Sequence, residues 1–278
     1  MTGILRKMSG RSLKSITKEL ERFAPLKYAE SWDNVGVLLE PFTERTVKTI
    51  LLTNDLTENV VKEGIEKNAE LIISYHPPIF ASLKRITNAT WKERIVSQCL
   101  ENRIAIYSPH TAWDFVNNGV NDWLANALPY STKEPIKTLP EVSEFVGGTG
   151  RLLSIDEDLC LRDAIEKVKI HAGIKSVNVA IGKNQNIDSS QIKSVAICAG
   201  SGASVFKGVK ADLYLTGEMS HHEVLDAQEK NISVILCNHS NSERGYLKEF
   251  KQLFHKMIPE SEVKVLVSEV DKDPLESY

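Results

Sequence analysis

Two stretches of the chain follow the same order of elements, and this internal repeat constrains the fold more than any other feature. Each half reads as strand, helix, strand, polar cluster, helix and strand, followed by a histidine and, four residues later, a carboxylate. The repeat therefore predicts two similar lobes. Three pairs of segments align: residues 48–57 with 193–202, Ala69 with Ala211, and residues 104–110 with 233–239.

Strands that alternate with helices predict an α/β fold, in which each lobe is a mostly parallel sheet flanked by helices. The spacing of apolar residues predicts a first helix over residues 13–23. Ligands of such sheets bind beyond the carboxyl ends of the strands, so we expect the functional site in the cleft between the lobes. Apolar runs predict strands at residues 46–53, 70–74 and 103–108.

Prolines and glycines interrupt residues 130–150, which we interpret as the crossing between the lobes. We expect a first lobe over residues 1–135, with His76, His110 and Asp114. The second lobe covers residues 136–278, with His239 and Glu243, and its C-terminal segment can return to the first lobe.

The charge balance argues against a general nucleic-acid binder, because 34 basic and 37 acidic residues give a net charge of −3. No apolar run approaches the roughly 20 residues of a membrane-spanning helix. The basic N-terminus resembles a mitochondrial presequence, but helical spacing from Leu13 leaves little room for a leader. We therefore expect a cytoplasmic or nuclear protein with no membrane and no direct nucleic-acid partner.

Five residues form a candidate metal cluster. His110 and Asp114 are four residues apart, as are His239 and Glu243, so each pair would share one face of a helical turn. His76 follows the second predicted strand and would enter the same crevice. Imidazole and carboxylate together suit Zn²⁺, Mn²⁺ or Fe²⁺. A bridging carboxylate would hold two such ions about 3.5–4 Å apart, as in two-metal hydrolases.

Each of these residues also has an ordinary interpretation. Ser240 and Glu243 fit a capping box, in which Glu243 would only bond the start of its helix. His76 alone could be an ordinary histidine at the end of a strand. The combination of three histidines and two carboxylates, all placed after strands, favours the metal cluster.

Other polar residues near the predicted strand ends could support the site. Glu218 and His222 could be ligands, but we favour roles beside the ligands or facing the substrate. Asp55 could act similarly or could cap the next helix, and the cap is the preferred interpretation. The segment 200–202 (Gly-Ser-Gly) could cradle a phosphate or form a tight turn.

Seven segments together resemble the Nif-three-like family, whose bacterial members include YbgI. The resemblance runs from Ser31 to Leu275 and is to eukaryotic members. It implies a two-lobed α/β fold, a toroidal homohexamer and dinuclear metal sites, with ligands on the five residues proposed above. Many bacterial members have a second histidine where this chain has Tyr75, which would remove one nitrogen ligand. The segments are SWDNVGVLL, LLTNDLT, IISYHPPIF, YSPHTAWD, TGEMSHHEVLDA, NHSNSERG and SEVDKDPL.

The leading hypothesis is a metal-dependent hydrolase of a phosphate ester or nucleotide-like substrate. The family label, GTP cyclohydrolase I type 2-like, points in addition to attack on a purine-ring carbon. The rival hypothesis is a non-catalytic adaptor or metal-handling protein, because the resemblance also implies transcription-related protein partners. Metal-dependent turnover would separate the two.

Overall fold

The computed structural model describes residues 9–138 and 147–276, and the chain divides into two compact units. Unit 1 comprises residues 1–113 and 247–272, and unit 2 comprises residues 114–246 and 273–278. This division places the first crossing before Asp114, whereas the sequence interpretation placed it after residue 135. The physical reason is that α5 (Val120–Ala125) packs against the sheet of unit 2.

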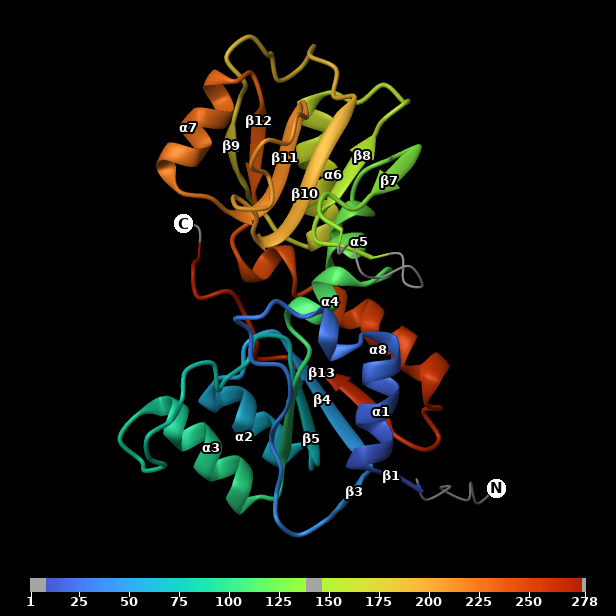
Figure 1. Ribbon diagram of the computed structural model, residues 1–278, viewed down its shortest axis with the longest axis vertical. Helices are drawn as coiled ribbons and strands as arrows, with labels where there is room; N and C mark the ends of the chain where they lie inside the picture. Colours follow the sequence, from blue (N-terminus) through green and yellow to red (C-terminus); the bar gives the residue numbers. More distant parts are fainter. Residues whose placement is uncertain (1–8, 139–146, 277–278) are drawn as a thin grey trace. The chain divides into compact units, whose positions relative to one another are not determined.

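Unit 1 is built on a five-stranded sheet in the order β13-β4-β5-β6-β2 (Figure 1). Strands β13, β4, β5 and β6 are parallel, and β2 pairs antiparallel with β6. The pairing of β13 with β4 draws the end of the chain back into this unit. Its elements are β1 (Arg11–Ser12), α1 (Leu13–Phe23), η1 (Leu26–Tyr28), β2 (Gly36–Leu39), β3 (Thr46–Val47), β4 (Thr49–Thr53), α2 (Glu58–Glu66), β5 (Leu71–Ser74), α3 (Trp91–Glu101), β6 (Ala105–Ser108), α8 (Tyr246–Met257) and β13 (Lys264–Val267).

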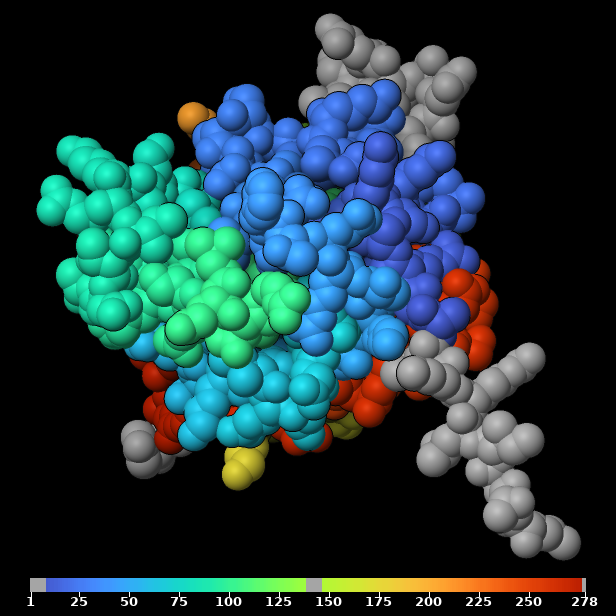
Figure 2. Space-filling model, turned by 90° about the horizontal axis from the view of Figure 1, so that it is seen from below, coloured from blue at the N-terminus to red at the C-terminus, as the bar shows by residue number. Residues whose placement is uncertain are grey.

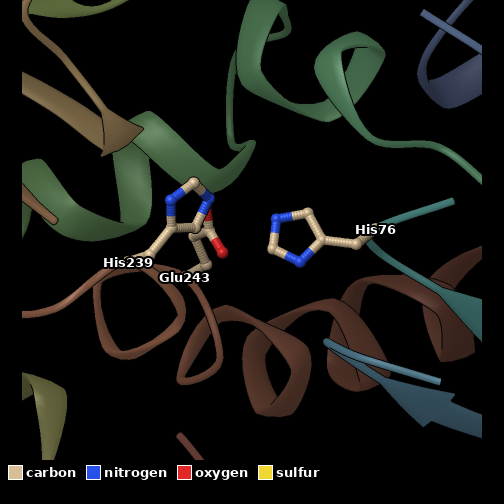
Figure 3. A group of neighbouring side chains, drawn as sticks. All are labelled: His76, His239 and Glu243. Carbon is tan, nitrogen blue, oxygen red and sulfur yellow. The ribbon is translucent and has the colours of Figure 1, made fainter. Parts of the chain in front are cut away.

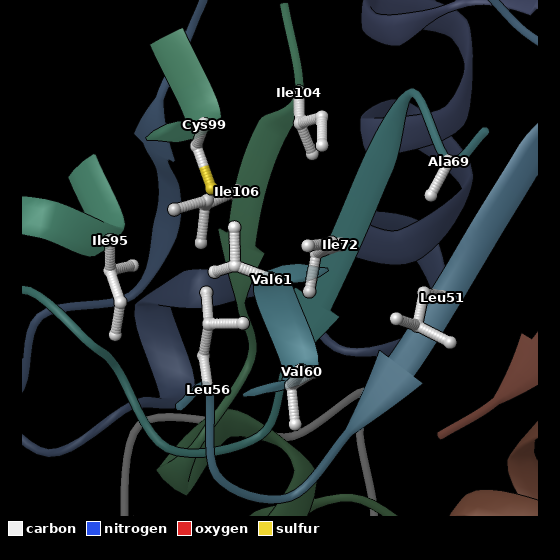
Figure 4. Packing of buried hydrophobic residues seen from close by; sticks show 10 residues of the cluster. All are labelled: Leu51, Leu56, Val60, Val61, Ala69, Ile72, Ile95, Cys99, Ile104 and Ile106. Atoms are coloured by element: carbon white, nitrogen blue, oxygen red, sulfur yellow. The ribbon is translucent and has the colours of Figure 1, made fainter. Parts of the chain in front are cut away.

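Helices cover both faces of this sheet. On one face, apolar residues of α2 and α3 pack on alternate residues of the central strands, as Figure 4 shows. The strands are apolar on both sides, which is typical of a parallel sheet buried between helices. Helices α1 and α8 cover the other face (Figure 1), with Phe23 and Phe250 in ring contact at 5.9 Å. The predicted helix over residues 13–23 is confirmed.

The edge of this sheet where the parallel strands begin faces the viewer in Figure 2. The segment around residues 40–48 (blue) lies at this surface, beside the end of α3 and the turn that follows it (green). The carboxyl ends of the strands, where the predicted ligands occur, form the opposite edge.

Unit 2 contains a six-stranded sheet in the order β7-β8-β10-β11-β12-β9. Strands β10, β11 and β12 are parallel, whereas β8 and β9 pair antiparallel with β10 and β12. Its elements are α4 (Thr111–Phe115), which crosses from unit 1, α5, β7 (Thr132–Glu134), β8 (Arg151–Ser154), α6 (Leu161–Ala172), β9 (Asn178–Ala180), β10 (Ser194–Ser201), β11 (Leu213–Glu218), α7 (His221–Glu229), β12 (Ser233–Leu236) and η2 (Ser240–Ser242).

The repeat predicted from the sequence corresponds to the central strands of the two sheets. In each unit three parallel strands follow in order, and an antiparallel strand pairs with the third. Ile50 pairs with Leu71 in unit 1, and Val195 pairs with Leu213 in unit 2, so the first two strands keep the alignment read from the sequence. The expectation of two similar α/β lobes is therefore confirmed.

Two details of the predicted repeat are wrong. Leu71 pairs with Ala105, and Leu213 pairs with Ser233, so Ser233 corresponds to Ala105 and not to Ile104. This register makes Asn238 the counterpart of His110, and both have a positive φ, of 67° and 31°. In addition, turns and no helix connect β10 to β11, and Val205 and Phe206 of those turns pack in the hydrophobic core of unit 2.

The described residues include no helix that is both long and apolar enough to cross a membrane.

Candidate metal centre

His76 lies two residues beyond the end of β5. Its backbone N–H donates to the carbonyl of Asn54, so the strand pairing holds this residue in position. The Nδ1 atom of His76 lies 2.9 Å from Oδ1 of Asp55, which follows the neighbouring strand β4. An imidazole that donates from Nδ1 presents its Nε2 lone pair as the metal ligand.

His110 occupies the corresponding place after β6. Its Nδ1 atom lies 2.7 Å from Oδ1 of Asp33, and its ring centroid lies 5.3 Å from that of His76. The two histidines of unit 1 therefore lie at the same edge of the sheet. The φ of 31° at His110 is rarely adopted by a residue with a side chain, and such backbone conformations are often found at functional sites.

Asp33 is a site residue that the sequence interpretation did not single out. Its side chain is fully buried. Burial alone would raise the pKa of Asp33, but hydrogen bonds from His110 and from the hydroxyl and backbone N–H of Thr111 hold that pKa below its ordinary value. Asp33 is therefore a carboxylate that fixes the orientation of the His110 ring.

His239 of unit 2 also has a carboxylate beside its Nδ1 atom. Its Nδ1 atom lies 2.9 Å from Oε1 of Glu218, at the end of β11. Its Nε2 atom lies 3.3 Å from Oε1 of Glu243, which is 3 % exposed (Figure 3). If Nδ1 donates to Glu218, a nitrogen lone pair and a carboxylate oxygen face each other. Such a pair of acceptors requires a proton or a metal cation between them.

Gly200 is a second residue that the sequence interpretation did not single out for this role. Its φ is +66°, and a Cβ atom at this position would lie 2.6 Å from Oε1 of Glu243 and 3.1 Å from Nε2 of His239. The absence of a side chain at position 200 therefore keeps space beside these two donor atoms.

Asp114 is the first residue of unit 2. Its carbonyl accepts a hydrogen bond of 3.0 Å from the side chain of Asn121. Burial raises the pKa of the Cys198 thiol, and the negative charges of Asp114 and Glu243 raise it further. The charges of both carboxylates therefore affect the same thiol, near the end of β10. Cys198 itself is a buried, protonated thiol.

Several other predicted roles change with the structure. Thr57, and not Asp55, caps helix α2, because its hydroxyl accepts from the N–H of Val60. The Ser240 hydroxyl donates to Asp273, so the expected capping box with Glu243 is replaced by other contacts. His222 lies in the exposed first turn of α7, and within the described ranges no hydrogen bond joins it to Glu218.

The Gly-Ser-Gly segment forms the end of strand β10, which stops at Ser201, and leads into a turn at residues 203–205. The N–H of Gly200 donates to the Ser242 hydroxyl, and the N–H of Gly202 donates to the Thr216 hydroxyl, at 2.8 and 3.0 Å. These two amides already have partners, which argues against a phosphate cradle, and the expected turn begins only after Gly202.

Comparison with known proteins identifies the family. A profile described as Duf34/NIF3 (NGG1p interacting factor 3) matches residues 11–274. The chain belongs to the Duf34/NIF3 family. It is 54 % identical over 276 residues to NIF3-like protein 1 of Drosophila melanogaster, covering 98 % of this chain and 92 % of that protein. It is 36 % identical to the NGG1-interacting factor 3 of Saccharomyces cerevisiae, over 97 % of this chain and 98 % of that protein.

The fold is shared with solved NIF3 structures. The crystal structure of a Bacillus cereus protein related to NIF3 superposes with a TM-score of 0.85 at 20 % identity, covering 96 % of this chain and 99 % of that one. In this family member, His76, His239 and Glu243 each offer a donor atom that could hold a metal ion.

Tyr75 directly precedes His76 after strand β5. Its side chain is 2 % exposed, and its ring lies 5.0 Å from that of His76 and 5.6 Å from that of His110. Tyr75 therefore packs as a core aromatic residue behind the two histidines.

Proposed function

We propose that this protein is a metal-dependent hydrolase with a dinuclear centre of Zn²⁺, Mn²⁺ or Fe²⁺. The observation that carries the proposal is the approach of His239 Nε2 to Glu243 Oε1, which lie 3.3 Å apart beside Gly200. The second support is that His76, His110 and His239 each have a carboxylate at Nδ1, an arrangement typical of metal-ligating histidines.

Five side chains are the proposed ligands. His76 and His110 supply two nitrogens, which are too few to complete even one four-coordinate ion. Asp114, His239 and Glu243 supply the remaining nitrogen and the carboxylates. A carboxylate such as Glu243, which is held in place by burial, can bridge two ions.

When bound, such ions supply Lewis-acid activation of water and of a phosphoryl oxygen. The residues of the chain supply orientation. Each histidine that is protonated at Nδ1 donates a hydrogen bond to its carboxylate partner, which is Asp55, Asp33 or Glu218. This hydrogen bond fixes the ring and increases the basicity of Nε2. The reaction that we propose for such a centre is hydrolysis of a phosphate ester or a nucleotide-like substrate.

Metal analysis of the purified full chain tests the proposal. We expect about two equivalents of metal in the wild type and a marked loss in His239→Ala and in Glu243→Ala. His221→Ala is the matched control, because His221 is an exposed histidine in α7 of the same unit. Full occupancy in both ligand variants would overturn the assignment. Loss of Mn²⁺- or Zn²⁺-dependent phosphate-ester hydrolysis in the same variants would support the catalytic role.

A second candidate function is that of an adaptor or metal-handling protein. The observation that favours it is the name of the yeast relative, NGG1-interacting factor 3, which implies a protein partner. The mild net charge of −3 suits a protein partner better than DNA. Stable capture of a transcription-related partner, together with no turnover in a broad screen of phosphate esters and nucleotides, would favour the adaptor.

We further propose a homohexameric ring and a cytoplasmic or nuclear location. Light scattering on the purified chain tests the ring, with a mass near six times 31.1 kDa expected. Imaging of the tagged full chain tests the location.

A further inference from the structure

Two large aromatic side chains of unit 1 are exposed although they lie in contact with each other. Trp32 is 59 % exposed and Phe80 is 55 % exposed, and their ring centroids are 6.1 Å apart at an interplanar angle of 62°. Neighbouring exposed aromatic rings are more often part of a binding surface than isolated apolar residues are. By contrast, Trp113 and Phe250 in the same unit are fully buried.

The segment that carries Trp32 is firmly held. The next residue, Asp33, accepts hydrogen bonds from the hydroxyl and the backbone N–H of Thr111 and pairs with His110. The N–H of Glu30 donates to the Thr111 hydroxyl at 2.9 Å. The exposed indole is therefore fixed in position, so a ligand that packs on it need not order the segment.

The segment that carries Phe80 is tied to the same place. The side-chain amide of Asn34 donates to the carbonyl of Ile79, which immediately precedes Phe80. One hydrogen bond thus connects the two segments on which the exposed rings stand, and it explains why the rings remain neighbours.

The pair also borders a proposed metal ligand. The ring of Trp32 lies 6.0 Å from that of His110, at an interplanar angle of 75°. A planar group that stacks on Trp32 would therefore place its substituents next to the ligand cluster of this unit.

We propose that Trp32 and Phe80 form an aromatic subsite that selects substrates with a planar ring, of the nucleobase class, beside the hydrolysed bond. This inference rests on the proposed function, because it assigns a substrate class to the same site. Stacking of a base on an aromatic side chain stabilises binding enough to change affinity by about tenfold or more.

Substrates that differ only in the base test the subsite. Adenosine 5′-monophosphate and ribose 5-phosphate carry the same phosphate ester, but only the nucleotide has a base. Only the nucleotide can therefore stack on Trp32 and Phe80. We expect Trp32→Ala and Phe80→Ala to lower kcat/KM for the nucleotide about tenfold, with ribose 5-phosphate changed less than about twofold. Trp32→Phe should recover most of the loss. Phe42→Ala, which removes an exposed ring at the other edge of the sheet, is the control.

Binding of adenosine without a phosphate gives a readout independent of turnover. We expect adenosine to quench tryptophan fluorescence of the wild type and of Trp91→Phe, since Trp91 is also exposed, but not of Trp32→Phe. Quenching without hydrolysis of either ester would support the subsite while removing the hydrolase proposal. Hydrolysis without quenching, or equal losses for both esters, would overturn the subsite and leave the hydrolase. A lower oligomeric mass of Trp32→Ala by light scattering would also overturn it, because the face would then join copies of the chain.

Discussion

Glu70 and Asp212 make the same pair of backbone contacts in the two units. Glu70 precedes β5, and its Oε2 atom accepts from the N–H groups of Lys48 and Thr49 at 3.0 and 2.8 Å. Asp212 precedes β11, and its Oδ2 atom accepts from Lys193 and Ser194, both at 2.9 Å. The repeat therefore extends from the strand order to a carboxylate that holds the start of the first parallel strand.

The shared contact predicts equivalent losses of stability. Glu70→Ala and Asp212→Ala should each lower the free energy of unfolding by about 2 kcal/mol, because two backbone donors lose a charged acceptor. Glu229→Ala, which removes a carboxylate with only an exposed ion pair to Lys183, should cost less than about 1 kcal/mol. Urea unfolding followed by circular dichroism measures these changes. If Glu70→Ala and Asp212→Ala lose no more stability than Glu229→Ala, these carboxylates do not stabilise the fold through their backbone contacts.

The space that Gly200 leaves beside His239 Nε2 and Glu243 Oε1 predicts the effect of adding one methyl group at this position. Gly200→Ala should abolish metal binding, because its Cβ would lie 2.6 Å from Oε1 of Glu243. The matched control is Gly208→Ala. Gly208 has a similar φ of +81°, but a Cβ there meets no atom within 4 Å. Both variants should lose about 1 kcal/mol or more of stability from the backbone. Metal titration by calorimetry separates them, and normal binding by Gly200→Ala would contradict the account.

The carboxylate partners of the histidines predict graded losses of metal affinity. Asp33→Asn, Asp55→Asn and Glu218→Gln should each weaken binding by about 10- to 100-fold, since an amide orients the ring without its charge. Asp188→Asn is a suitable control because Asp188 forms an exposed ion pair with Arg162. Competition with a fluorescent chelator measures the affinities. Unchanged affinity in all three variants would mean that these pairs are structural only.

Removal of the metal should lower thermal stability. A ligand present at 100 times its Kd stabilises the folded state by about 2.7 kcal/mol, so chelation should lower the Tm by several degrees. Added Mn²⁺ or Zn²⁺ should restore the Tm of the wild type but not that of His239→Ala. A Tm that is insensitive to chelation, in a sample shown to contain metal, would argue against sites built from these residues.

Much of the fold could be predicted from the sequence because its strands are short apolar runs bounded by polar residues. The run before Asn54 and the one before Tyr75 are strands as expected, and helix α1 has the predicted bounds. The third strand was misaligned by one residue, because both Ile104 and Ala105 begin an apolar segment that resembles the one at Ser233. Only the hydrogen-bonded pairing decides between them.

The predicted site was less complete, for a different reason. The histidines could be found because each follows an apolar strand. Asp33 lies 77 positions before the histidine that it contacts, and the sequence gives no spacing that links the two. Gly200 belongs to the site because side-chain atoms of Glu243 and His239 lie close to where a Cβ atom of residue 200 would be. Contacts between residues so distant in the chain depend on strand order and on the turns, which periodicity does not determine.

Anomalous diffraction from crystals of the full chain, measured on both sides of the absorption edge of the bound metal, would locate the metal ions and identify their ligands. We expect two anomalous peaks per chain, coordinated by Nε2 of His76, His110 and His239 and by the carboxylates of Asp114 and Glu243. Peaks bound elsewhere, or ligation of these histidines through Nδ1, would contradict this assignment.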